Sequence, residues 1–290
     1  MTTFAGSDGT PLYYEDRDHD GVDSGVPPVV ALAGGAALHP DYLGDLAGLG
    51  DRRRLVVPHL RGVGRSPLPD DVKRASFWRQ AEDLDLLRAE LGLDRLLVLG
   101  HSAGTRLAIS YAIRFPGRVA GLVLVTPPVS YPPIGRLVDQ PADTAALLLR
   151  RQGEPAMDAA VAAAAAGPET WDDAGFNAWQ QRVAPLGYAA WGERERAHAA
   201  ATHYSFAANR AYFSMPAPAD LVARLGAVTA PVLVVAGGAD CAAGVAPVAA
   251  LARLFPAGRA EVIDGSGHFP WVERPAAFRR AVDGFLDALP

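Results

Sequence analysis

The sequence has one cysteine, Cys241, among its 290 residues. A single cysteine cannot form a disulfide within the chain, which is typical of proteins in a reducing compartment, so we expect a cytoplasmic location. Residues 1–20 show neither the basic segment nor the apolar core of a secretory signal. No apolar run approaches the roughly 20 residues that span a bilayer, and we therefore expect no membrane partner.

Positive charge is also scarce. The 27 Lys and Arg residues are outnumbered by 32 Asp and Glu residues, which gives a net charge of −5. This balance excludes the basic footprint of a nucleic-acid-binding protein. The histidines lack ligand spacing such as His-x-x-x-His beside a carboxylate, so we expect no metal site.

The most informative segment is an apolar run that ends in a Gly-x-Ser-x-Gly pentapeptide. Residues 96–99 are Leu-Leu-Val-Leu without polar alternation, which predicts a buried parallel strand. Apolar residues at helical spacing follow the pentapeptide of residues 100–104. A serine between strand and helix lies on a tight turn that exposes its hydroxyl at the helix N-terminus. We therefore predict Ser102 as a nucleophile.

A nucleophilic serine needs a base and an acid that orients the base, each after a later strand. Residues 231–236 form a second apolar run, and Asp240 follows it. A short strand at residues 260–264 precedes His268. Because the carboxyl ends of parallel strands meet at one edge of a sheet, Ser102, Asp240 and His268 are expected to converge there.

Glycines after an earlier strand predict the donors for a developing oxyanion. The apolar run of residues 28–33 ends at Gly34 and Gly35, where the main chain can approach a substrate carbonyl closely. We expect the backbone N–H groups of Gly35 and Ala103 to form this oxyanion hole, with Gly34 and Ala36 as neighbouring candidates.

These motifs together resemble the proline iminopeptidase family of α/β-hydrolases. Residues 34–37 and, four residues later, Tyr42 and Leu43 are similar to its His-Gly-Gly-Pro-Gly segment followed by Tyr-Leu. Residues 59–66 are similar to its Asp-x-Arg-Gly-x-Gly-x-Ser segment. The resemblance runs from about residue 10 to the end of the chain and implies acyl-enzyme cleavage of an amide or ester without a cofactor.

The chain also departs from this family pattern. Ala33 stands where the family has histidine before its glycines, and Ala36 and Ala37 replace Pro-Gly. His59 replaces the aspartate before Arg-Gly. Ala103 follows the nucleophile where several aminopeptidases have tryptophan. The resemblance therefore implies the chemistry more strongly than a preference for an N-terminal proline.

The predicted fold class is α/β: an α/β-hydrolase fold with a mostly parallel central sheet flanked by helices and an inserted helical cap. We expect a core formed by residues 1–127 and 217–290. The strand–helix alternation stops at residues 126–133, and the Ala- and Trp-rich segment that follows contains no strand-like run. Residues 128–216 are therefore expected to form the cap.

The resemblance favours an aminopeptidase or amidase acting on a small molecule or short peptide. The expected substrate contacts are Gly34, His101, Trp191 and Glu193. Trp191 and Glu193, with one residue between them, resemble the adjacent Trp-Glu pair near which the family binds an amine. An esterase, thioesterase or lactonase is the alternative, because an apolar roof without a carboxylate suits an uncharged acyl substrate. A non-catalytic binder is a third hypothesis. The sequence does not predict the oligomeric state.

Overall fold

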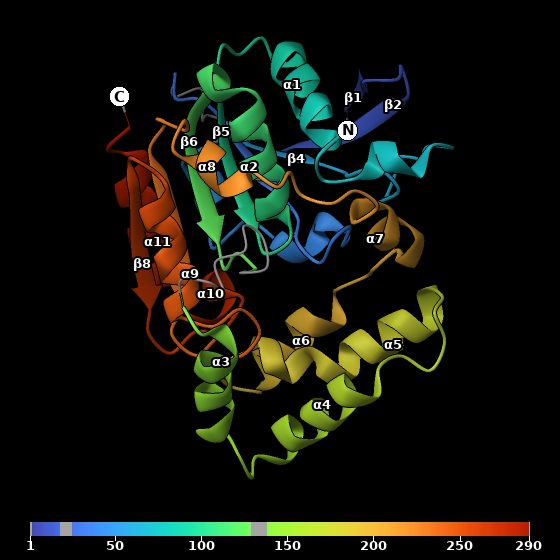
Figure 1. Cartoon of the computed structure of the whole chain (residues 1–290), viewed down its shortest axis with the longest axis vertical. Helices are drawn as coiled ribbons and strands as arrows, with labels where there is room; N and C mark the ends of the chain where they lie inside the picture. Colours follow the sequence, from blue (N-terminus) through green and yellow to red (C-terminus); the bar gives the residue numbers. More distant parts are fainter. Residues whose placement is uncertain (1, 18–24, 129–137, 290) are drawn as a thin grey trace.

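The computed structural model describes residues 2–17, 25–128 and 138–289. These residues form an eight-stranded β-sheet with helices around it (Figure 1). The strand order is β1-β2-β4-β3-β5-β6-β7-β8. The strands are β1 (Thr2–Ala5), β2 (Pro11–Arg17), β3 (Val29–Leu32), β4 (Leu55–Pro58), β5 (Leu96–His101), β6 (Val119–Val125), β7 (Val232–Gly237) and β8 (Gly258–Ile263). Neighbours from β4 to β8 run parallel, whereas β1 and β2 join antiparallel.

Burial explains why these segments form strands. Every residue of β3, β4, β5 and β7 is buried, as their uninterrupted apolar runs predict for strands covered on both faces. In β2 only Leu12 and Tyr14 are buried, which fits a strand with one solvated face. The strand β1, which the sequence pattern does not predict, pairs with β2 at this edge.

Helices cover both faces of the sheet. One face packs against α1 (Gln80–Glu90), α2 (Gly104–Arg114) and α9 (Ala246–Leu251). The other packs against the 3₁₀ turn η1 (Pro40–Leu43), α10 (Pro270–Glu273) and α11 (Pro275–Leu286). This arrangement confirms the predicted mostly parallel sheet flanked by helices.

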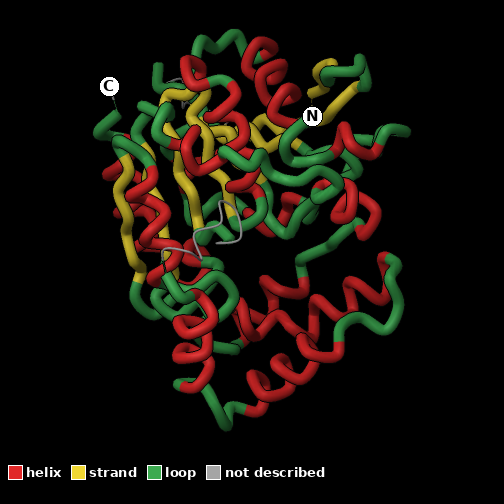
Figure 2. The backbone as a smooth tube through the Cα atoms, in the orientation of Figure 1, coloured by secondary structure: helices red, strands yellow, loops and turns green. Residues whose placement is uncertain are grey.

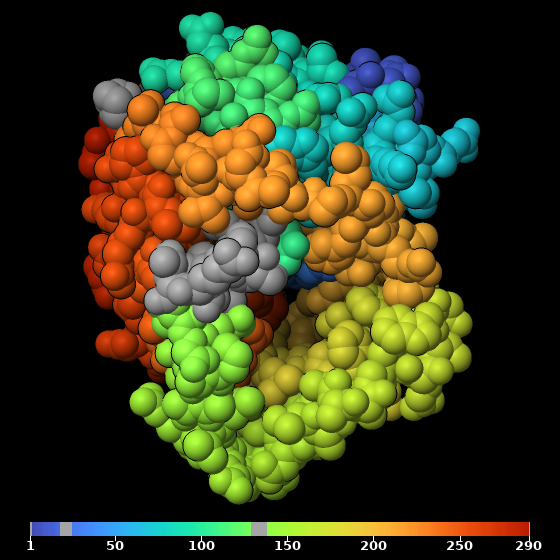
Figure 3. All heavy atoms as spheres, viewed as in Figure 1, coloured from blue at the N-terminus to red at the C-terminus, as the bar shows by residue number. Residues whose placement is uncertain are grey.

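Between β6 and β7 the described chain forms helices and turns only, apart from one isolated β-bridge at Tyr204. These helices are α3 (Gln140–Leu149), α4 (Pro155–Ala166), α5 (Asp173–Val183), α6 (Glu193–Ala200), α7 (Phe206–Tyr212) and α8 (Leu221–Leu225). Figure 2 shows that α3 to α6 form a layer beyond the sheet. The space-filling view is hollowed beside this layer (Figure 3). Residues 129–137 of the expected cap lie outside the described residues.

None of the helices in the described ranges is both long and apolar enough to cross a membrane. The loops after β3, β5, β7 and β8 all leave the same edge of the parallel part of the sheet. Open α/β sheets place ligands at that edge.

Candidate active site

Ser102 lies on a strained turn between β5 and α2. Its φ angle is +48°, a left-handed conformation that is rare for residues other than glycine. Its N–H donates to the Val125 carbonyl over 2.8 Å. A Cβ on Gly104 would lie 2.5 Å from the Ala33 carbonyl oxygen, and a Cβ on Gly100 would lie 2.9 Å from the Gly104 carbonyl oxygen. The two glycines are therefore needed for the close backbone approach that forms this turn.

His268 and Asp240 form a hydrogen-bonded pair. His268 Nδ1 lies 2.8 Å from Asp240 Oδ2. The other carboxylate oxygen accepts from the N–H groups of Ala242 and Ala243 over 2.9 and 3.0 Å. Asp240 is fully buried and accepts hydrogen bonds only, so the His268 Nδ1 carries the hydrogen and Nε2 remains an acceptor.

The structure brings Ser102 next to the loop after β3. A Cβ on Gly34 would lie 3.0 Å from the Ser102 Cβ. Among the described residues, no hydrogen bond joins the Ser102 hydroxyl to His268. Hydrogen bonds of this kind are often long before substrate binds.

The backbone N–H groups of Gly34 and Gly35 differ in their partners. The Gly34 N–H donates to the Tyr42 hydroxyl over 2.6 Å. The N–H groups of Gly35 and Ala103 have no hydrogen-bond partner in the described part of the chain. These two N–H groups are consequently available to a ligand, whereas that of Gly34 is not.

His101 connects the loops around Ser102. Burial and the neighbouring His268 hold the pKa of His101 well below its ordinary value, so its imidazole is neutral. Its Nε2 lies 3.0 Å from the His268 carbonyl oxygen and must therefore carry the hydrogen. Its Nδ1, 2.7 Å from the Tyr42 hydroxyl, then accepts from that hydroxyl. A chain of hydrogen bonds thus runs from Gly34 through Tyr42 and His101 to His268.

Further contacts fix the loop that carries His268. Its carbonyl also accepts from the Thr126 hydroxyl over 3.0 Å, and its N–H donates to the Gly187 carbonyl over 2.7 Å. The buried Glu273 carboxylate accepts from the N–H groups of Gly267 and Ala189 over 2.6 and 2.8 Å. Burial raises the pKa of Glu273. These bonds tie the His268 loop to the segment between α5 and α6.

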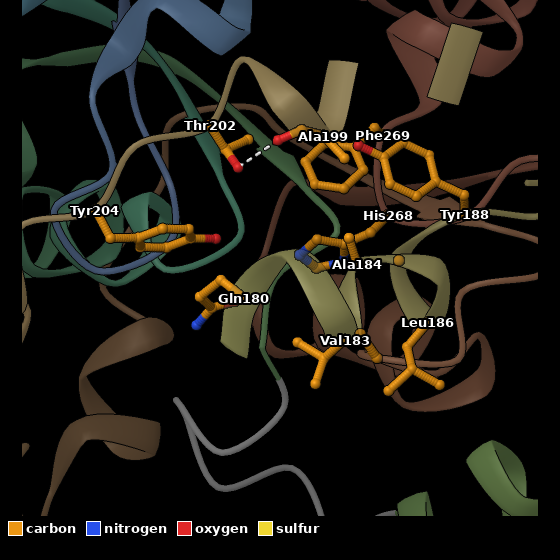
Figure 4. Close-up of a pocket in the computed structure, with 12 residues that line it drawn as sticks. Gln180, Val183, Ala184, Leu186, Tyr188, Ala199, Thr202, Tyr204, His268 and Phe269 are labelled. Carbon is orange, nitrogen blue, oxygen red and sulfur yellow. Dashed lines mark hydrogen bonds between the residues drawn. The ribbon is translucent and has the colours of Figure 1, made fainter. Parts of the chain in front are cut away.

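A cavity of about 240 Å³ borders the His268 imidazole (Figure 4). The residues that line it are Gln180, Val183, Ala184, Leu186, Gly187, Tyr188, Ala199, Thr202, Tyr204, Ala242, His268 and Phe269. The lining is mostly apolar and contains no carboxylate. Ser102 is not among these residues. The volume is below the roughly 300–1,000 Å³ of most ligand pockets, which suits a small substrate.

None of the four expected substrate contacts lines this cavity. Gly34 and His101 are buried and form the hydrogen bonds described above. Glu193 is exposed at the start of α6, and Trp191 packs with its ring centroid 5.4 Å from that of Tyr188. The Gly192 N–H donates a hydrogen bond to the Glu195 carboxylate over 2.9 Å, and this bond caps the start of α6. Among the described residues, no group of three His, Cys, Asp or Glu side chains could hold a metal ion.

The structure shows contacts around the site that the sequence pattern does not specify. Tyr204 and Gln180 line the cavity from the helical layer, and the Thr126 hydroxyl donates to the His268 carbonyl. Tyr42 belongs to a recognisable motif, but only the folded chain places its hydroxyl between Gly34 and His101.

Comparisons with known proteins agree with this architecture. A family model described as the alpha/beta hydrolase fold matches residues 27–275. A proline iminopeptidase of Heyndrickxia coagulans is 32% identical over 124 residues, which are 43% of this chain and 42% of that relative. The match therefore spans less than half the length of that relative.

Two further similarities cover more of the chain. A Bacillus subtilis protein named putative 2-succinyl-6-hydroxy-2,4-cyclohexadiene-1-carboxylate synthase is 27% identical over 242 residues, which are 81% of this chain and 82% of that protein. The solved structure of an esterase from Rhodococcus has a TM-score of 0.71 and 25% identity, covering 100% of this chain and 99% of that one.

Proposed function

The chain belongs to the α/β-hydrolase fold family and is a hydrolase, and on that premise we propose that it cleaves small, uncharged carboxylic esters through a serine nucleophile. The observation that carries this proposal is the His268–Asp240 pair, because His268 lines an apolar cavity and its ring lies 5.0 Å from that of His101, the residue before the strained Ser102. In this scheme Ser102 is the nucleophile, His268 the base and Asp240 the acid that orients it.

The chemistry follows in two stages. The Ser102 Oγ attacks the ester carbonyl carbon while His268 Nε2 takes the hydroxyl proton. The N–H groups of Gly35 and Ala103 stabilise the oxyanion, and His268 returns its proton to the departing alkoxide. A water molecule, deprotonated by His268, then attacks the acyl-serine and releases the carboxylic acid. Asp240 keeps the hydrogen on Nδ1 throughout.

The lining of the cavity favours an ester over a free-amine substrate. An aminopeptidase needs a carboxylate to pair with the substrate ammonium, because a buried unpaired charge is costly. The lining holds none, and residues 129–137, which lie outside the described ranges, contain no Asp or Glu in the sequence. Glu193, the expected partner, is solvent-exposed.

The expected aminopeptidase activity is the second candidate. The similarity to the Heyndrickxia coagulans proline iminopeptidase favours it, although that match covers 43% of this chain. For either activity we assign residues 128–216 the role of a cap that covers the proposed triad and shields the bound substrate from bulk solvent. The packing of His268 against Gly187 and of Gly267 against Tyr188 supports this role.

Labelling by a fluorophosphonate tests the nucleophile directly. The intact mass of the wild-type protein is expected to increase by one phosphonyl group, with the adduct on Ser102 after peptide mapping. The Ser102→Ala variant is expected to stay unlabelled. An adduct on another residue, or an unlabelled but folded wild-type protein, would overturn the proposed role of Ser102.

A further inference from the structure

The hydroxyl of Tyr204 projects into the cavity without a hydrogen-bond partner among the described residues (Figure 4). Other hydroxyls of the same lining are paired. The Tyr188 hydroxyl bonds to His198 Nδ1 over 2.7 Å, and the Thr202 hydroxyl donates to the Ala199 carbonyl over 2.7 Å. Tyr204 therefore differs from its neighbours in having its polar group available to a ligand.

Contacts of both the backbone and the ring fix the position of Tyr204. Its N–H donates to Asn177 Oδ1, and its carbonyl accepts from Asn177 Nδ2, each over 2.8 Å. Its backbone forms an antiparallel bridge with Leu38, and its ring packs edge-on against Phe176 at 5.5 Å between centroids. The ring also lies against Gly35, where an added Cβ would be 2.6 Å from Tyr204 Cε1. The hydroxyl is thus held rigidly beside the candidate oxyanion loop.

The chemistry of this hydroxyl limits what it can bind. Burial raises the pKa of Tyr204 to about 12, so the group stays protonated and uncharged at neutral pH. It can donate a hydrogen bond but cannot act as a base there. The hydroxyl has no acceptor among the described residues, so an acceptor atom of a ligand can take its hydrogen bond.

Gln180 supplies a second polar group on the same side of the cavity. It lies on α5, three residues after Asn177, and its carboxamide has no hydrogen-bond partner in the described part of the chain. In Figure 4 the Tyr204 hydroxyl points toward His268, and Gln180 lies between these two residues with its amide nitrogen directed away from His268. Apart from His268, the lining contains no Asp, Glu, Lys, Arg or His side chain.

We propose that Tyr204 and Gln180 form a subsite for an uncharged oxygen of the substrate, an ether, hydroxyl or carbonyl oxygen other than that of the scissile bond. The inference rests on the proposed ester hydrolysis. Two neutral groups, one a donor and the other both donor and acceptor, match such an oxygen and provide no counter-ion for an ammonium or a carboxylate. The preferred substrates are therefore small esters that carry a further uncharged oxygen outside the ester group, rather than plain alkyl esters.

Two pairs of nearly isosteric esters test this subsite. On the acyl side, p-nitrophenyl methoxyacetate replaces one CH₂ of p-nitrophenyl butyrate with oxygen. On the alcohol side, 2-methoxyethyl acetate replaces one CH₂ of n-butyl acetate in the same way. The ratio of kcat/KM within each pair is compared between wild type and Tyr204→Phe, so that the intrinsic reactivity of the esters cancels.

In Tyr204→Phe we expect the preference for the oxygen-containing ester to fall roughly 10-fold in one of the two pairs. Gln180→Met should shift the same ratio in the same direction. The matched control is Tyr111→Phe, which removes a hydroxyl near Asp85, outside the cavity, and should leave both ratios unchanged.

Unchanged ratios in both pairs, or an equal loss for all four esters, would overturn the subsite while leaving ester hydrolysis intact. If Tyr204→Phe does not fold, Gln180→Met decides the outcome by the same criterion. Absence of hydrolysis of every ester together with absence of fluorophosphonate labelling at Ser102 would instead overturn the proposed function, and the subsite with it.

Discussion

The imidazole of His101 donates from Nε2 to the main-chain carbonyl of His268 over 3.0 Å. The residue next to the candidate nucleophile therefore supports the loop of the candidate base. Through Tyr42 the same imidazole is connected to Gly34, so one chain of hydrogen bonds joins the loops after β3, β5 and β8. In the proposed mechanism these loops carry the groups that must keep fixed distances during acyl transfer.

Tyr42→Phe should lower kcat more than it changes KM. The variant leaves the Gly34 N–H and the His101 Nδ1 without their partner, although both are buried. The loss of such a partner costs about 1–3 kcal/mol, and we expect the free energy of unfolding to decrease by this amount in urea denaturation.

Tyr14→Phe is the matched control, because Tyr14 is also buried but packs against Phe4 at the far edge of the sheet. A Tyr42→Phe variant with wild-type kcat would show that this chain of bonds does not position the reacting groups.

Stability should decrease as the pH falls below about 6.5, the ordinary pKa of histidine. Burial lowers the pKa of both His101 and His198, so the unfolded chain binds protons in this range that the folded chain does not. The free energy of unfolding therefore decreases as the pH falls, by up to about 1.4 kcal/mol per pH unit for each such group. Urea denaturation at pH 7.5, 6.5 and 5.5 measures this slope.

His198→Gln should give a shallower slope than wild type, because it removes one of the groups whose pKa is lowered by burial. Equal slopes for wild type and His198→Gln would contradict the lowered pKa assigned to His198.

Asp240→Asn should lower kcat by about 10,000-fold, the loss seen when an amide replaces the acid of a Ser-His-Asp triad. The amide no longer holds the hydrogen on His268 Nδ1, so Nε2 is not left as the acceptor. Asp264→Asn is the control, because Asp264 is exposed at the same edge of the sheet. Steady-state kinetics that show similar losses for both variants would contradict a specific role for Asp240.

Gly35→Ala should lower kcat by roughly 100- to 1,000-fold, the usual effect of losing one oxyanion donor. The added Cβ would lie 2.6 Å from Tyr204 Cε1 and 2.8 Å from Leu38 Cβ, so the loop must move. Gly44→Ala is a matched control: Gly44 also has a positive φ, +53°, but a Cβ there meets nothing within 4 Å. Near-normal kcat in Gly35→Ala would exclude this N–H as a required donor.

The sheet and the loops at its edge are predictable because local signals specify them. The apolar runs that become β3, β5 and β7 are fully buried, and Gly35, Ser102 and Asp240 follow them directly. The strand β1 has no comparable signal, since only Phe4 of its four residues is buried. Its formation depends on pairing with β2.

The lining of the cavity could not be predicted in the same way. It depends on how α5, the turn η6 (Ala184–Gly187) and α6 pack over the sheet edge, which no short motif encodes. Trp191 and Glu193 match a family pattern in sequence, yet the capping bond between Gly192 and Glu195 starts α6 with Glu193 in solvent. Conversely, Tyr204 reaches the cavity because Asn177 and Leu38 hold its backbone.

The most direct test of the central claim compares ester and amide turnover in wild type and Ser102→Ala. The substrates are p-nitrophenyl acetate and butyrate beside L-prolyl- and L-alanyl-p-nitroanilide. We predict rapid ester hydrolysis that Ser102→Ala abolishes, with little release of p-nitroaniline from either amide. Serine-dependent cleavage of the amides at rates above those of the esters would contradict the esterase assignment. Ester hydrolysis that persists in Ser102→Ala would contradict the serine mechanism itself.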